Sequence, residues 1–195
     1  MRSAVPALRN RLLRRLRRED GFTLVELLVS MSIMLLVITG LASVFVAGSN
    51  AEVDLRNRFQ AQSEARLALD KMRREIHNSC SASVSSPSGS GYAAVTLYSE
   101  NAGAGYTCTN SATWCAVGTG TRFKIYRKAG TTCDATGSVR WADYVTSNAV
   151  FTLVAATAGT LPKVGVDLPV DTKPSDTRRR YRLQDAIAVR NYLRS

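Results

Sequence analysis

A long apolar run occupies residues 22–48 and contains one charged side chain, Glu26. An α-helix rises about 1.5 Å per residue, so about 20 apolar residues are enough to cross the hydrocarbon core of a membrane. The apolar centre of a cleavable secretory signal is shorter, at about 7–15 residues. The pattern therefore predicts a transmembrane helix over residues 22–48.

The pattern becomes amphipathic beyond this run. Between residues 52 and 77, apolar side chains recur at spacings of three and four, apart from a gap around Gln62: Leu55, Phe59, Ala65, Leu69, Met72 and Ile76. This spacing places them on one face of a helix, which we expect to be buried. No proline interrupts residues 22–86, so we expect one helix from about residue 22 to residue 78, in which residues 49–78 continue the transmembrane part.

Short runs rich in β-branched and aromatic residues follow the helix. They predict strands over 92–98, 121–127, 139–145, 149–155, 163–170 and 185–193. The Ser-rich stretch 79–91 and the polar stretches 99–120 and 171–180 are predicted to be loops. A helix followed by a meander of strands predicts an α+β fold. In this fold the long helix packs on an antiparallel β-sheet, which forms a head over residues 79–195.

The distribution of charge predicts the orientation in the membrane. The chain has a net charge of +11, and residues 1–20 contain seven arginines against two acids. Basic segments that flank a transmembrane helix stay on the cytoplasmic side. We therefore expect a single-pass protein of the inner or cytoplasmic membrane, with its N-terminus in the cytoplasm and its head outside.

The sequence lacks the motifs of common catalytic sites. Its only histidine is His77, at the predicted end of the helix, and it contains neither a G-x-x-x-x-G-K-[ST] loop nor an H-E-x-x-H pair. We therefore expect a protein that is not an enzyme and that has no cofactor and no metal site.

All four cysteines lie in the predicted external head, where an oxidising compartment permits disulfides. They are Cys80, Cys108, Cys115 and Cys133. Four cysteines allow three pairings, and buried free thiols are a further alternative. We favour Cys108 with Cys115, which closes a short loop, and Cys80 with Cys133.

Glu26 is the unusual residue of the transmembrane run. An ionisable group costs about 2.5–3.5 kcal/mol at the centre of a bilayer, and such groups are functional candidates. Position 26 is within about one turn of the predicted helix start, so one interpretation is that its carboxylate reaches the interface. The other interpretation requires a positive partner, which a new α-amino group at Phe22 would supply.

An Arg-rich segment, then GFTLVELL at residues 21–28, then an uninterrupted apolar run resembles the processing site of type IV prepilins and type II secretion pseudopilins. The resemblance implies that a prepilin peptidase removes a basic leader, residues 1–21, by cutting after Gly21. It implies that the enzyme methylates the new amine of Phe22. Glu26 would then neutralise the amine of a neighbouring pilin or pseudopilin during assembly. The alternative is an ordinary signal-anchor.

Two further features bear on the subclass. The stretch EARLALDKMRREI, residues 64–76, resembles the J-type and W-type minor pseudopilins and pilins. Many members of these families have a proline that kinks the helix just past its middle, and residues 22–86 have none. Gly40 and Gly48 are the weak points that remain in the helix.

Three functions are compatible with the sequence. The first is a minor structural subunit of a type IV pilus or type II secretion-like filament, at the cell surface or in the periplasm once assembled. The second is a DNA-binding minor pilin of an uptake apparatus, whose nucleic-acid contacts would come from a basic cluster beside Tyr181: Arg178, Arg179, Arg180 and Arg182. We favour a solvated loop for this cluster, because nearby aspartates offset its charge. The third is an unrelated anchored surface domain.

Overall fold

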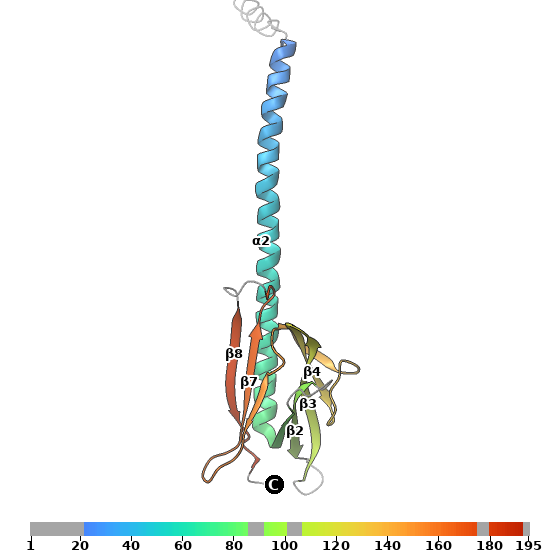
Figure 1. The fold of residues 1–195 in the computed structure, drawn as a ribbon, viewed down its shortest axis with the longest axis vertical. Coiled ribbons are helices and arrows are strands. Elements are labelled where there is room, and N and C mark those ends of the chain that lie inside the picture. Colours follow the sequence, from blue (N-terminus) through green and yellow to red (C-terminus); the bar gives the residue numbers. More distant parts are fainter. Residues whose placement is uncertain (1–21, 86–91, 101–106, 175–179, 193–195) are drawn as a thin grey trace, which may run out of the picture. The chain divides into compact units, whose positions relative to one another are not determined.

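The structure is a computed structural model that describes residues 22–85, 92–100, 107–174 and 180–192. The chain divides into two compact units, one that ends at Glu52 and one that begins at Val53. One long helix followed by antiparallel strands confirms the expected α+β class (Figure 1).

Helix α2 runs from Leu24 to Asn78, which confirms the single uninterrupted helix. Its first part is long and apolar enough to cross a membrane, with a mean hydropathy of 2.4 over its most apolar window. Four hydroxyl side chains of this part donate hydrogen bonds to carbonyls about one turn earlier: Ser30, Ser32, Thr39 and Ser43. Such bonds satisfy polar side chains where lipid offers no partner.

The second part of α2 buries a face that differs from the expected one. Its buried residues are Ala61, Ala65, Ala68, Leu69, Met72 and Ile76. The prediction was correct for Ala65 and the residues after it, but wrong for Leu55 and Phe59, whose exposed fractions are 64% and 76%. Phe59 precedes Ala65 by six residues, which places it about 120° away around a helix of 3.6 residues per turn. Small alanines occupy the buried face instead.

Within the described ranges of the chain, eight antiparallel strands form the sheet. Their bounds are β1 Ser79–Ser85, β2 Ala93–Glu100, β3 Cys108–Thr119, β4 Arg122–Ala129, β5 Val139–Val145, β6 Phe151–Val154, β7 Lys163–Val170 and β8 Tyr181–Ala188. The order is β1-β2-β3-β4-β5-β7-β6, and β8 pairs with the other edge of β7.

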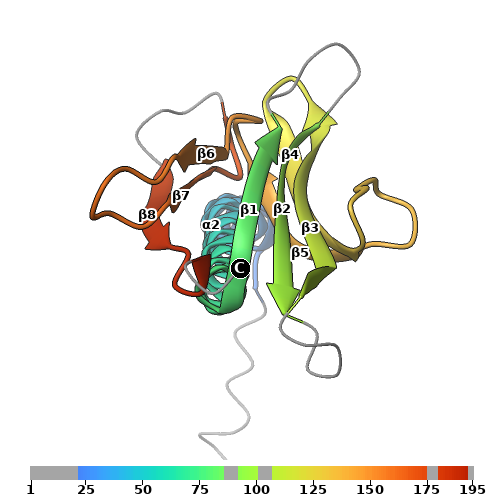
Figure 2. The ribbon, with the colours of Figure 1, turned by 90° about the horizontal axis from the view of Figure 1, so that it is seen from below.

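The sheet bends where β5 meets β7, because these two strands share a single residue pair, Val145 with Val170. Strands β1–β5 therefore form one wing and β6–β8 another, and Figure 2 shows the second part of α2 between the two wings. The buried side chains of both wings and of α2 form one hydrophobic core, in which Trp114 is fully buried.

Two strands lie where loops were expected. Strand β1 occupies the start of the Ser-rich stretch 79–91, and β3 occupies most of the polar stretch 99–120. Strand β3 consists largely of polar and small residues, yet its residues 108–116 pair with β2 on one side and its residues 112–119 pair with β4 on the other. Its strand conformation follows from these two neighbours. The last strand also begins earlier than expected, at residue 181, and ends at residue 188.

A half-buried carboxylate, that of Glu75, joins α2 to the β1–β5 wing. Glu75 Oε2 accepts a hydrogen bond of 2.8 Å from Trp114 Nε1, and Glu75 Oε1 accepts one of 2.9 Å from Arg127 Nε. Lys71 Nζ lies 3.3 Å from Glu75 Oε1. Hydrogen bonds to charged groups are worth about 1.5–3 kcal/mol each, so Glu75 sets how α2 sits on the wing.

Other polar contacts join α2 to β8 on the opposite wing. Arg73 Nη2 lies 2.7 Å from Asp185 Oδ2, and this pairing raises the pKa of Arg73 above its ordinary value. Arg66 Nε donates to the Tyr181 hydroxyl at 2.9 Å. Through these contacts α2 is fixed to both wings.

All four cysteines form disulfides, but their pairing differs from the one that the sequence analysis favoured. They join Cys80 to Cys108 and Cys115 to Cys133, with Cα–Cα distances of 6.3 and 6.0 Å. The expected Cys108–Cys115 bond is wrong because both residues lie in β3. Seven strand residues span about 23 Å at 3.3 Å per residue, whereas a disulfide requires Cα atoms less than about 7 Å apart.

Replacement of Glu75 tests the junction between α2 and the β1–β5 wing. We expect Glu75→Ala to lower the free energy of unfolding by about 2–3 kcal/mol, because it leaves the Trp114 N–H buried without an acceptor. Urea unfolding of the purified chain in detergent, followed by tryptophan fluorescence, measures this change. The control is Asp70→Ala, which breaks an exposed pair with Arg73 and should cost below about 1 kcal/mol. Equal effects of the two variants would contradict the assignment.

Peptide mapping tests the disulfide pairing. Chymotrypsin cuts after aromatic residues, and cleavage at Trp114 separates Cys108 from Cys115. In a non-reduced digest we expect one linked peptide pair containing Cys80 and Cys108 and another containing Cys115 and Cys133. Both should disappear in a reduced digest, and a peptide linking Cys80 to Cys133 would contradict the structure.

Candidate functional site

The first candidate site is the start of α2. Phe22 and Thr23 precede the helix, and Thr23 lies at its N-cap position: Leu27 N donates to the Thr23 carbonyl at 3.2 Å. The Thr23 hydroxyl accepts the backbone N–H of Glu26 at 3.3 Å, as an N-cap side chain does. Gly21, the residue before the expected cut, lies outside the residues that the structure describes.

Thr23 is an N-cap residue that the sequence prediction did not include. The signal was present, because Thr23 and Glu26 have the S/T-x-x-E spacing of a capping box. The cap begins the helix immediately after Phe22. As a result, Phe22 lies just ahead of the first helical turn, and Glu26 lies within that turn.

Glu26 is exposed in the first turn of α2. A carboxylate there is stabilised by the helix dipole, whose positive end is at the N-terminus. Among the residues that the structure describes, none forms an ion pair with this carboxylate. The positive partner that the assembly role requires would therefore have to be supplied by the amine at Phe22 of a neighbouring subunit or by another group outside the described chain.

The first part of α2 is apolar around its whole circumference. Its large apolar side chains from Leu24 to Val46 are all exposed. Apart from Glu26, the polar side chains among them are four hydroxyls that are bonded to the backbone. A helix that is apolar all round is buried in its functional state, in a membrane or among other apolar helices. This surface therefore suits both the lipid bilayer and a bundle of like helices.

The second candidate site is the basic cluster, which the structure brings together in part. Arg178 and Arg179 lie outside the described residues. Arg182 donates to Asp167 from Nε at 2.9 Å and from Nη2 at 2.6 Å, and these bonds lower the pKa of the Asp167 carboxyl below its ordinary value. The positive charge of Arg182 is thereby neutralised.

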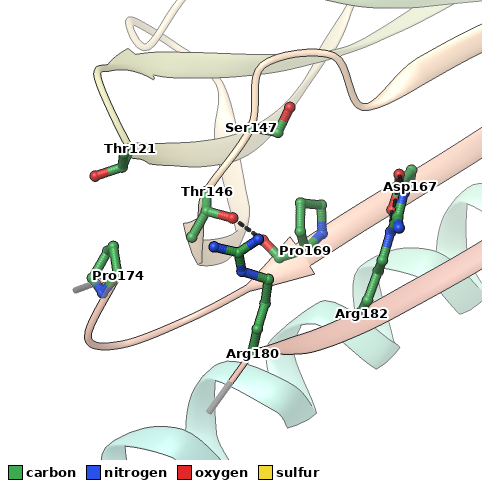
Figure 3. A pocket seen from close by; sticks show the side chains of 8 residues that line it. All are labelled: Thr121, Thr146, Ser147, Asp167, Pro169, Pro174, Arg180 and Arg182. Carbon is green, nitrogen blue, oxygen red and sulfur yellow. Dashed lines mark hydrogen bonds and ion pairs between the residues drawn. The ribbon is translucent and has the colours of Figure 1, made fainter. Parts of the chain in front are cut away.

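Arg180 points elsewhere. It lines a cavity of about 320 Å³ whose other walls include Thr121, Thr146 and Pro169. In Figure 3 its guanidinium points toward Thr146 and Pro169, whereas Arg182 points to Asp167. Tyr181, the aromatic of the cluster, lies under Arg66, whose guanidinium carbon is 5.5 Å from the ring centroid.

The other chemical features fall outside these sites. His77 Nδ1 lies 3.0 Å from the Ala188 carbonyl, to which it donates, so this side chain helps to join α2 to β8. In the described parts of the chain, no group of three or more His, Cys, Asp or Glu side chains could hold a metal ion.

The start of α2 lies within a segment that matches a known protein family. Residues 16–42 match the family described as the prokaryotic N-terminal methylation motif. No curated protein and no solved structure matches the chain. The matched segment includes Gly21, Phe22 and Glu26, so it covers the whole of the first candidate site. The motif supports a type IV pilin-like or pseudopilin protein that is processed by prepilin peptidase.

Proposed function

We propose that this protein is a minor subunit of a type IV pilus or of a type II secretion-like pseudopilus. One observation carries the proposal: the methylation motif at residues 16–42 lies at the start of an apolar helix whose first turn contains Glu26 without an ion-pair partner among the described residues. The role is structural, and the protein is the substrate of an enzyme, the prepilin peptidase.

Processing converts the N-terminus into one half of a charge pair. Cleavage after Gly21 releases the basic leader and creates a positive amine on Phe22, which the peptidase then methylates. Thr23 caps the helix just beyond this point, so the new amine is held beside the end of a regular helix.

Assembly uses the same apolar surface twice. Before assembly, the first part of α2 lies in the membrane, with the leader on the cytoplasmic side. In the filament, apolar helices of neighbouring subunits replace the lipid. The Glu26 carboxylate then attracts the Phe22 amine of the adjoining subunit, and this attraction is strong because it grows as the local dielectric constant falls.

The head is on the far side of the membrane from the leader. Its two disulfides fit an oxidising compartment. The likeness of residues 64–76 to J-type and W-type proteins supports a minor subunit, and in the structure this segment supplies most of the buried face of α2.

The cleavage step can be tested by mass spectrometry of the N-terminal peptide. We expect the wild-type chain to begin at N-methylated Phe22, and Gly21→Val to retain Met1, because the larger side chain blocks the cut. Gly40→Ala is the matched control: a Cβ at Gly40 meets nothing within 4 Å, so processing should be normal. A wild-type N-terminus at Met1, or one beyond residue 45, would exclude the proposal.

The assembly step can be tested by replacing Glu26. Glu26→Gln keeps a side chain that suits the third position of a capping box but removes the charge. We expect normal cleavage and at least a tenfold loss of the subunit from sheared filaments, equivalent to about 1.4 kcal/mol or more. Glu52→Gln, an exposed acid later in the same helix, should assemble normally. Normal recovery of Glu26→Gln in filaments would refute the charge-pair mechanism.

A further inference from the structure

A second basic surface lies on the head, away from the cluster that the sequence suggested. Successive residues of a strand point to opposite faces, and in β4 the buried Phe123 and Ile125 point into the core. Arg122, Lys124 and Lys128 therefore share the outer face of β4. The spacing of alternate residues along a strand is about 6.6 Å, so these side chains form a regular row.

Three cations of this region converge on one acid. Around Asp143 lie Arg122 Nε at 3.8 Å, Lys124 Nζ at 3.8 Å and, from β5, Arg140 Nη1 at 3.4 Å. The Asp143 side chain is 10% exposed, whereas those of Arg122, Lys124 and Arg140 are 58%, 40% and 50% exposed. The acid is thus covered by its partners, and a net charge of +2 from three cations and one acid faces solvent.

The backbone fixes this arrangement. The ladder between β4 and β5 contains a bulge opposite Lys124, and within it Tyr144 has a positive φ of 62°. This conformation is costly for a residue other than glycine, and such strain collects at functional sites. With this backbone conformation, Tyr144 N donates to Asp143 Oδ1 at 2.7 Å. The centroid of the Tyr144 ring lies 4.3 Å from the guanidinium carbon of Arg122. Asp143 and Arg122 are therefore held in place.

The surrounding sheet face carries little negative charge. Strands β1–β5 contain five basic residues, while Glu100 and Asp143 are their only acids. Beside Lys128 the ladder continues through Thr113 and Thr96, which are uncharged and buried. Lys128 itself is paired with Asp134, since its Nζ lies 3.1 Å from Asp134 Oδ1. The positive charge that this face presents to solvent is therefore that of Arg122, Lys124 and Arg140 around Asp143.

The chemistry of this face favours phosphates over a protein partner. Stable protein interfaces are centred on buried apolar and aromatic side chains. The exposed large apolar side chain of β1–β5 is Val139, which is paired with Arg127 in the ladder. Paired residues point to the same face of a sheet, and Arg127 points to Glu75 on the helix side. Val139 therefore lies on the opposite face from the cations. A polyanion requires no apolar centre, since its affinity comes from the release of counterions.

We infer that Arg122, Lys124 and Arg140 form a binding surface for the phosphate backbone of double-stranded DNA. Binding does not depend on base sequence, because contacts of these cations with phosphates carry no sequence information. The surface belongs to the head, and its action is independent of cleavage after Gly21.

Fluorescence anisotropy of a labelled DNA duplex, titrated with the full processed chain in a nonionic detergent, tests this inference. Three phosphate contacts predict that log K falls with log salt with a slope of about −3 between 50 and 200 mM NaCl. The test variant combines Arg122→Gln, Lys124→Gln and Arg140→Gln with Asp143→Asn, so that no buried acid is left unpaired. We expect it to bind at least tenfold more weakly at 50 mM NaCl.

Two further variants separate a local site from overall charge. Asp143→Asn alone removes the covered acid and should tighten binding several-fold. The matched control replaces two exposed cations elsewhere by glutamine, Lys163 and Arg190, so that its net charge falls by two as in the test variant, and it should bind within about twofold of wild type. Thermal unfolding of each variant confirms that it is folded.

The inference is overturned if the wild type does not bind DNA at 50 mM NaCl, or if the control loses as much affinity as the test variant. It is also overturned if poly-L-glutamate at an equal charge concentration displaces the duplex as well as unlabelled DNA does. That result would assign the surface to the carboxylates of an acidic protein.

Discussion

The fold of the head depends on the close contact between the second part of α2 and the sheet. Ala61, Ala65 and Ala68 are buried on the face of α2 that enters the core, together with the larger Met72 and Ile76. Glu75, bonded to Trp114 and Arg127, fixes the position of the helix on the β1–β5 wing. The ladder between β5 and β7 contains one residue pair, Val145 with Val170, and backbone hydrogen bonds beside it join Thr146 to Pro169 and Asp171 to Tyr144. The buried side chains of α2 complete the core between the two wings.

One continuous helix thus serves two environments. Up to about residue 48 its surface is apolar all round and its hydroxyls bond to its own backbone, as a lipid environment requires. Beyond Val53 it buries one narrow face and exposes charged residues on the others. The proposed function uses both parts, because the first supplies the assembly surface and the second carries the head.

The two basic features of the head show why charge in a sequence is a poor guide to charge on a surface. The arginines near Tyr181 form a dense cluster in the sequence, but Arg182 is neutralised by Asp167 across the β7–β8 pair. Arg122, Lys124 and Arg140 are separated by other residues in the sequence, and the pairing of β4 with β5 gathers them around one acid. Strand register, not spacing along the chain, decides which cations act together.

The sequence by itself determined the features that depend on local pattern. The apolar run, the uninterrupted helix, the α+β class and the motif around Gly21, Phe22 and Glu26 are all readable because each depends on residues close together in the chain. Only the tertiary structure decided the pairing of the cysteines, the strand conformation of β3 and the exposure of Phe59. The physical reason is common to all three, since each is set by which distant segments lie side by side, and neither periodicity nor composition encodes that proximity.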